Sequence, residues 1–272
     1  MKQQYLGFLN TSSISNSQVF FGLTPFNFEE ISKKSTLPNS IDLTINHNEV
    51  LGKRAEHFFE YSIRLSPHYE VIAKNIQIFK EKITIGELDF LVKDIHNHKV
   101  IHIELVFKFY VYDPNILDEI NRWIGPNRKD SLVEKIDKLK NKQLPLLFND
   151  QTKSILDDFN LDVNKIDQQV CYLASLFVPY SFKEKEMQLV NNDSIVGYWI
   201  HFEEFIPKKY ASFRFYIPKK KDWIVHPRHH EVWHSFDEIY EQIEDLYMQK
   251  KSSLLWINNG ENSYERIFII WW

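Results

Sequence analysis

Two apolar segments of strand length, joined by a short polar linker, constrain the fold of this chain more than any other feature. Residues 84–92 and 100–110 are rich in β-branched and aromatic side chains, and residues 93–99 between them are typical of a turn. This pattern predicts a β-hairpin. Both predicted strands also carry acidic residues, and an ionised carboxylate among apolar neighbours is costly unless a cation or hydrogen-bond donors satisfy it. The hairpin is therefore also a candidate functional site.

The acidic residues of the hairpin can be assigned to faces, because side chains alternate along a strand. Glu87 and Asp89 share one face of the first strand, and Glu104 and Lys108 share one face of the second. A suitable register would bring Asp89, Glu104 and Lys108 onto a common face. Two interpretations fit such a triplet: a salt bridge on a half-solvated sheet, or a Mg²⁺ site for phosphodiester chemistry.

The residues around the triplet favour the second interpretation. The segment Gly-Glu-Leu-Asp-Phe at residues 86–90 is followed, after the turn, by Glu104 and Lys108. This arrangement resembles the PD-(D/E)XK nuclease superfamily, which includes restriction endonucleases and Holliday-junction resolvases. Upstream, residues 51–60 are similar to the first core helix of that superfamily, with Glu56 at its acidic position.

A narrower resemblance, to the DUF1853 family, covers residues 48–180. It is carried by Thr84 to Phe90, by Glu104 to Tyr110, by Trp123-Ile124-Gly125-Pro126 and by the predicted helix from Asp130 to Gln143. Together the resemblances imply an α/β fold: a restriction endonuclease-like core with a mixed central β-sheet flanked by helices, plus a C-terminal α+β extension.

The superfamily resemblance also implies that the protein is a divalent-metal-dependent nuclease, and it implies which residues bind the metal. Asp89, Glu104 and the backbone carbonyl of Leu105 would coordinate Mg²⁺ or Mn²⁺. Lys108 would orient the attacking water or stabilise the developing charge, and Glu56 would be an outer ligand. The implied partner is nucleic acid, with DNA favoured over RNA.

The position of Lys108 departs from the superfamily pattern and leaves a second function open. The superfamily lysine stands two residues after the glutamate, where this chain has Val106. Lys108 lies two residues further, about 7 Å along the strand at a rise of ~3.3 Å per residue. A protein that kept the fold but lost catalysis, and binds nucleic acid or serves in an assembly, is therefore the alternative.

Three further polar residues are candidates for supporting the site. Glu87 would lie behind the metal ligands. Gln143 falls on the apolar stripe of the predicted helix that Ser131 and Glu134 cap, and it would either contact substrate or a metal-bound water, or bond to neighbouring backbone. Lys135, on the same helix, would contact phosphate or be solvated.

The predicted organisation has three parts. An N-terminal extension covers residues 1–47, the nuclease-like core covers 48–180, and the C-terminal extension covers 181–272. We expect a helix over 50–65 that ends before Pro67, a helix that ends before Pro145, a further helix within 151–169, and a buried strand over 170–178. In the C-terminal part we expect strands over 196–202, 212–217, 254–257 and 266–272, with a helix from Ser235 to about Lys250.

Composition limits the remaining functional classes. The net charge of −4 gives no global positive field to recruit nucleic acid, so basic residues would have to act locally. The single cysteine, Cys171, excludes an intramolecular disulfide framework and a multi-cysteine zinc site, and its apolar surroundings predict a packing role. No segment has the length and hydrophobicity of a membrane span. We expect a cytoplasmic protein without membrane contact, and a homodimer stays open.

The string His230-Glu231-Val232-Trp233-His234 matches the zinc-peptidase pattern HExxH. That chemistry needs both histidines on one face of a helix. Ser235 and Glu238 form a capping box immediately afterwards, so the string is predicted to precede the helix and cannot present that geometry. The histidines of this region, with Arg228, Trp223 and Lys219 to Lys221, form either a basic surface for nucleic acid or an ordinary solvated face.

Overall fold

The predicted hairpin is present as strands β2 (Ile83–Asp94) and β3 (Lys99–Tyr112), which pair antiparallel. The computed structural model describes residues 1–16, 19–34, 41–260 and 263–272. The chain divides into two units, each built from separated segments. The hairpin unit comprises Ser13–Phe107 and Glu134–Leu173, and the C-terminal unit comprises Met1–Ser12, Lys108–Val133 and Ala174–Trp272. The predicted boundaries near residues 47 and 180 stay predictions.

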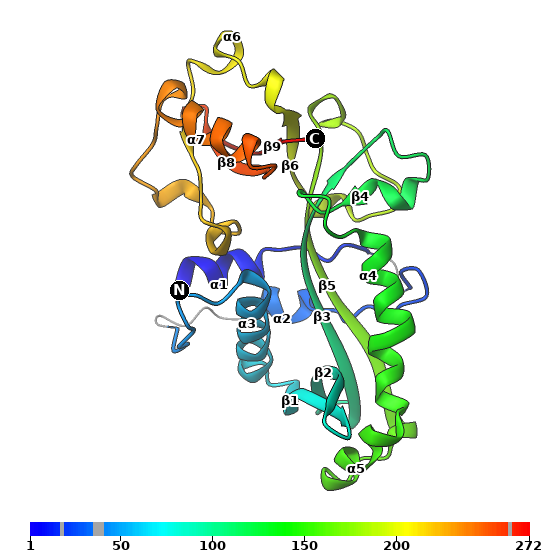
Figure 1. Cartoon of the computed structure of the whole chain (residues 1–272). Coiled ribbons are helices and arrows are strands. Elements are labelled where there is room, and N and C mark those ends of the chain that lie inside the picture. Colours follow the sequence, from blue (N-terminus) through cyan, green and yellow to red (C-terminus); the bar gives the residue numbers. More distant parts are fainter. Residues whose placement is uncertain (17–18, 35–40, 261–262) are drawn as a thin grey trace. The chain divides into compact units, whose positions relative to one another are not determined.

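In the hairpin unit the strand order is β1-β2-β3-β5, with β1 (Tyr69–Lys80) antiparallel to β2 and β5 (Ile166–Pro179) next to β3. Helix α3 (Leu51–Leu65) lies on one side of these strands and the helical stretch that begins with α4 lies on the other (Figure 1). The Phe59 ring of α3 packs 4.9 Å from the Phe90 ring of β2. Helix α3 ends two residues before Pro67, because the residue before a proline disfavours helical geometry.

The segment that leads into α3 is held by a buried arginine. Arg54 is 3% exposed, and its guanidinium donates to the backbone carbonyls of Asn46, His47 and Glu49. These bonds fix the start of the helix, whose N-cap residue Val50 has no side-chain acceptor to offer. They also fix the turn of helix that carries Lys53 and Glu56. A short helix, α2 (Glu29–Lys34), precedes this segment.

The helical stretch after residue 131 departs from the prediction. It starts as α4 (Leu132–Lys138), widens into a π-helical turn over Leu139–Gln143, tightens into a 3₁₀ turn over Leu144–Phe148, and is followed by α5 (Asp150–Asp158). Pro145 does not end the stretch, because it stands in the first turn of the 3₁₀ segment, where its missing N–H costs nothing. The predicted helix within residues 151–169 is correspondingly shorter, and β5 begins at Ile166.

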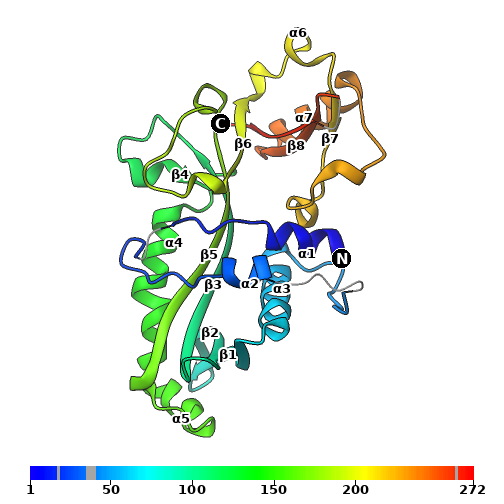
Figure 2. The same cartoon turned by 180° about the vertical axis from the view of Figure 1, so that it is seen from behind.

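In the C-terminal unit the strand order is β5-β6-β9-β8-β7. The two-residue strand β4 (Trp123–Ile124) pairs antiparallel with β3. Strands β6 (Ile195–His201) and β9 (Tyr264–Ile270) run parallel, whereas β8 (Ser253–Asn258) is antiparallel to both β9 and β7 (Arg214–Tyr216). The sheet is therefore mixed, as expected for the α/β class. Figure 2 shows these strands from behind.

Helix α7 (Phe236–Met248) covers one face of the C-terminal strands. Its residues Ile239 and Ile243 pack with Leu255, Ile257 and other buried apolar side chains. The predicted capping box is present, because Ser235 Oγ accepts from the Glu238 amide and the Glu238 carboxylate accepts from the Ser235 amide. The unit also contains α1 (Lys2–Leu9), within the segment predicted only as an N-terminal extension, and α6 (Pro207–Tyr210). None of the helices in the described ranges combines the length and the hydrophobicity that crossing a bilayer requires.

Candidate functional site

The register of the hairpin brings two of the predicted acidic residues together. The β2–β3 ladder runs from Asp94 opposite Lys99 to Phe90 opposite Ile103. Asp89 and Glu104 are the next residue on each strand beyond this ladder, and the charge of Glu104 acts on the Asp89 carboxyl. The amide of Leu105 donates to Asp89 Oδ2 at 2.9 Å, which fixes the carboxylate against the neighbouring strand.

The environment of Asp89 favours the protonated form of its carboxyl. Burial and the charges of Glu104 and Glu56 together raise the pKa of Asp89 to about 8, although the hydrogen bond from the Leu105 amide and the charge of Lys135 act in the opposite direction. Two carboxylates in one desolvated site cannot both ionise at low cost unless a positive charge joins them. The pair is therefore suited to a divalent cation or to a shared proton.

Glu104 is fully buried and both of its oxygens are engaged. His102 Nε2 lies 3.0 Å from Oε1, and Gln143 Nε2 donates to Oε2 at 2.5 Å. Gln143 in turn accepts from Lys135 Nζ at 2.7 Å. The predicted residues Gln143 and Lys135 thus belong to the site as a hydrogen-bonded chain that ends on Glu104. Gln143 closes the π-helical turn, a feature that is frequent at functional sites.

His102 is a site residue that the sequence analysis missed. The Gln168 side-chain amide donates to the Leu144 carbonyl at 2.7 Å and lies 3.0 Å from His102 Nδ1. Because that amide nitrogen is a donor, Nδ1 is the acceptor, and the proton of the neutral ring is on Nε2, facing Glu104. The available signal was position, since His102 precedes Glu104 by two residues and shares its face of the strand.

Two residues that were not predicted from the sequence, Lys53 and Asn75, each contact both Glu56 and Glu87. Lys53 Nζ lies 2.9 Å from Glu56 Oε2 and 3.4 Å from Glu87 Oε1, and Asn75 Nδ2 donates to the same two oxygens at 2.9 and 3.2 Å. Lys53 could have been identified, because it stands one helical turn before Glu56. Asn75 gave no signal: it lies in β1 with a left-handed φ of 50°.

Lys108 is engaged with a different acidic residue. Its Nζ is 2.5 Å from Asp130 Oδ2, and both residues belong to the C-terminal unit. A Cβ at position 125 would lie 2.0 Å from Asp130 Oδ1, so a residue larger than Gly125 would displace the carboxylate that Lys108 contacts. The predicted grouping of Lys108 with Asp89 and Glu104 stays a prediction.

The oxygen atoms of Asp89 and Glu104 are the candidate ligands for Mg²⁺ or Mn²⁺. Within the part of the chain that the structure describes, no group of three or more His, Cys, Asp or Glu side chains is arranged to hold a metal ion. Mg²⁺ commonly takes only one or two protein carboxylates and completes its shell with water and substrate phosphate. Asp89 and Glu104 offer such a pair, and a carboxylate that accepts two hydrogen bonds keeps free lone pairs. The residues therefore fit a site that is completed by substrate.

The HExxH string lies outside a helix, as predicted. His234 pairs with Phe215 through the backbone and α7 begins only at Phe236. The two histidines therefore lack the one-turn helical spacing that a zinc peptidase needs.

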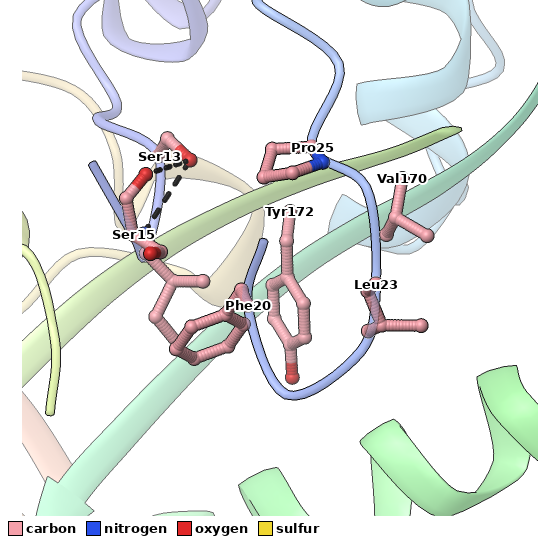
Figure 3. Close-up of a pocket in the computed structure, with 8 residues that line it drawn as sticks. Ser13, Ser15, Phe20, Leu23, Pro25, Val170 and Tyr172 are labelled. Atoms are coloured by element: carbon pink, nitrogen blue, oxygen red, sulfur yellow. Dashed lines mark hydrogen bonds between the residues drawn. The ribbon is translucent and has the colours of Figure 1, made fainter. Parts of the chain in front are cut away.

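A small hollow in the hairpin unit contains none of the predicted site residues. Most of its lining is apolar, and its two serines are bonded to each other, with Ser13 Oγ donating to the Ser15 carbonyl at 3.0 Å (Figure 3). It offers no acid, base or metal ligand apart from a tyrosine hydroxyl. The lining residues are Ser13, Ile14, Ser15, Phe20, Leu23, Pro25, Val170 and Tyr172.

Comparison with known proteins gives a family but no activity. The family model described as "Domain of unknown function (DUF1853)" matches residues 28–270, which is most of the chain. No curated protein and no solved structure matches this chain.

Proposed function

Starting from the membership of this chain in the DUF1853 family, we propose that it is a divalent-metal-dependent nuclease that hydrolyses phosphodiester bonds of nucleic acid. The observation that carries this proposal is the pairing of Asp89 with Glu104 on adjacent strands. Burial and the neighbouring carboxylate raise the pKa of Asp89 to about 8, so a divalent cation would relieve the repulsion between the two groups.

The residues around the pair support a fixed ligand geometry. His102 and Gln143 hold one oxygen each of Glu104, and the Leu105 amide holds one oxygen of Asp89. Such supporting hydrogen bonds orient ligating carboxylates and reduce the reorganisation that binding requires. Mg²⁺ or Mn²⁺, held by these two side chains and the Leu105 carbonyl, would supply Lewis-acid activation of the scissile phosphate.

A lysine near the acidic residues would bind the charge that develops on the phosphate. Lys53 takes this role in the proposal, because its ammonium group contacts Glu56 and Glu87 on the elements that flank Asp89. Half of the Lys53 side chain is exposed to solvent, so the ammonium group can reach a bound phosphate. Glu56 and Glu87 would keep that ammonium group in place.

A second candidate function is nucleic-acid binding without cleavage. The ion pair between Lys108 and Asp130 favours it, because the lysine of the catalytic strand is then engaged outside the carboxylate pair. The two candidates differ in one measurable property, which is divalent-dependent turnover.

The test combines metal binding with cleavage. Mn²⁺ is titrated calorimetrically into wild type, into the double variant Asp89→Asn/Glu104→Gln, and into Glu60→Gln as a matched control on α3. Glu60 is paired with Arg64 and Lys74 and lies outside the carboxylate pair. All three proteins are then incubated with single-stranded, duplex and branched DNA and with RNA, with and without Mn²⁺.

We expect wild type and Glu60→Gln to cleave at least one substrate in a Mn²⁺-dependent manner, and the double variant to lose cleavage while circular dichroism shows it folded. Cleavage by the double variant with unaltered metal dependence would overturn the proposal. Nucleic-acid binding by wild type without turnover on any substrate would replace the nuclease with the second candidate.

A further inference from the structure

An arginine of the C-terminal unit has a buried donor, its Nε, that no described residue satisfies. Arg266 of β9 stands opposite Trp256 of β8 in the antiparallel register, and its guanidinium carbon lies 4.5 Å from the centroid of the Trp256 ring. Arg266 is half-buried, and its Nε is shut off from solvent without an acceptor among the described residues. The indole Nε1 of Trp256 is also buried without an acceptor among the described residues.

Such unsatisfied donors are rare and point to a missing acceptor. A buried N–H that finds no partner costs free energy, and a charged donor costs more than a neutral one. Two other arginines of the unit have acceptors: Arg128 pairs with the carboxylate of Asp113, and Arg122 donates to the Ile116 carbonyl. No ion pair joins Arg266 to a carboxylate among the described residues, and burial lowers its pKa to about 10. An oxyanion placed against the guanidinium would supply the acceptor.

Further positive charge gathers around Arg266. The His226 ring lies 5.5 Å from the Trp256 ring. The pKa of His226 is lowered, mainly by burial and in addition by the positive charges of Arg228, Arg266 and His229. No carboxylate contributes to that shift. The same segment carries Lys219 and Lys220, both exposed, in a protein whose net charge is −4. The charges that act on the His226 ring are therefore positive, although the net charge of the protein is negative.

Aromatic side chains border this positive cluster. The rings of Trp233 and Tyr264 are stacked 5.6 Å apart, and the ring of His226 meets Tyr264 at 5.5 Å. Trp233 and Tyr264 are both half-buried, so part of each ring remains open to solvent. Aromatic neighbours exclude water from a cation and strengthen its interaction with an anion. Basic residues interleaved with partly exposed aromatic rings are the combination that single-stranded nucleic acids bind.

We propose that Arg266, together with His226 and Arg228, forms a phosphate-binding subsite for a strand of nucleic acid. The planar guanidinium takes one phosphate group, and the lysines at 219 and 220 take a neighbouring phosphate. This subsite rests on the nucleic-acid substrate of the proposed function, but it does not depend on the chemistry at Asp89 and Glu104. Its test therefore uses no divalent metal.

The test measures binding of a fluorescein-labelled ten-nucleotide oligothymidylate to the full chain by fluorescence anisotropy, in EDTA and at several salt concentrations. The variants are Arg266→Met, Arg266→Lys and the charge control Lys165→Met, whose side chain is 83% exposed in the hairpin unit. Inorganic phosphate is added as a competitor to separate a phosphate contact from base stacking. Circular dichroism and urea unfolding check that each variant is folded.

We expect Arg266→Met to weaken binding at least tenfold and to reduce the slope of log K against log salt by about 0.7, the value for one lost contact with a single strand. Arg266→Lys, which keeps the charge but loses the planar donor fork, should bind with intermediate affinity. Lys165→Met should bind as wild type does. Millimolar phosphate should compete with the oligonucleotide in wild type and have less effect in Arg266→Met.

Three results would overturn this assignment. One is equal affinity and equal salt slope in wild type and Arg266→Met. Another is no oligonucleotide binding by wild type at low salt, and the third is equal competition by inorganic phosphate in wild type and in Arg266→Met. Loss of oligonucleotide binding in Arg266→Met, with Mn²⁺ binding by this variant intact in a separate calorimetric titration, would show that the subsite acts independently of the carboxylate pair. A failure of the nuclease assay alone would leave the subsite standing.

Discussion

His102 Nε2 lies 3.0 Å from Glu104 Oε1, and neither side chain is exposed to solvent. A buried carboxylate must be satisfied by donors, and here a neutral histidine supplies one of them. The Gln168 side-chain amide nitrogen donates to the Leu144 carbonyl and also faces His102 Nδ1, so Nδ1 acts as an acceptor and Nε2 carries the proton. Adding a proton at Nδ1 would set two donors against each other. Gln168 thus keeps His102 in the tautomer that serves Glu104.

Replacement of His102 by alanine should destabilise the fold. The change leaves Glu104 Oε1 buried without its donor and opens a cavity, so we expect the free energy of unfolding to fall by about 2–4 kcal/mol. His102→Gln, which can still donate, should recover part of the loss. Urea unfolding followed by circular dichroism measures both values. His68→Ala, at an exposed position, is the control, and a loss of the same size there would contradict the buried-donor explanation.

The Asp89 carboxyl should make stability depend on pH in a defined direction. Its pKa is about 8 in the folded protein and 3.8 when unperturbed, so between these values the folded state holds a proton that the unfolded state has lost. Its contribution to stability is therefore fully present below about pH 3.8 and is lost as the pH rises through about 8. Urea unfolding of wild type and Asp89→Asn from pH 5 to pH 9 checks this, because asparagine carries no titrating proton.

The expected result is a difference between the two proteins that favours Asp89→Asn increasingly as the pH rises. A constant difference over this range would mean that Asp89 ionises at its ordinary pKa. The same proton should compete with Mn²⁺, since a metal ligand must be deprotonated. Mn²⁺ affinity of wild type should therefore increase with pH up to about 8.

Cys171 should report global unfolding. It is fully buried in β5, and burial raises the pKa of its thiol far above the ordinary value. A thiol in this state is a poor nucleophile. We expect no reaction with a thiol-specific disulfide reagent in the native protein and complete reaction of this single cysteine in urea, with a midpoint equal to that from circular dichroism. Rapid labelling of the native protein would indicate local opening of β5.

Local patterns in the sequence predicted much of the hairpin unit. The alternation along residues 84–92 and 100–110, with a turn of fixed length between them, was enough to set β2, β3 and the shared face of Asp89 and Glu104. The inward position of Gln143 on its helical stripe marked it as a candidate, and its side chain donates to Glu104, while its contact with substrate or a metal-bound water stays a prediction. These features depend on neighbours within one element or one tight turn.

The features that were missed depend on residues far apart in the chain. Gln168 reaches His102 across 66 residues, and Asn75 reaches Glu56 across 19 residues from a left-handed position in β1. The π-helical turn over Leu139–Gln143 was not predicted either, since the segment has an ordinary helical pattern. Arg266 gave no warning either, because a lone arginine in a strand is ordinarily paired or solvated.

The two lysines of the proposed nuclease should differ in their effect on turnover. Lys53 contacts Glu56 and Glu87 beside Asp89, whereas Lys108 is paired with Asp130. If Lys53 binds the developing charge on the phosphate, Lys53→Met should lower kcat about 10²-fold with little change in KM, which is typical of losing one stabilising group. Lys108→Met should lower kcat less than tenfold. Steady-state kinetics on the substrate with the highest turnover measures both, and Lys53→Arg, which keeps the charge, should regain part of the rate. A larger loss in Lys108→Met than in Lys53→Met would return the catalytic role to the lysine of β3.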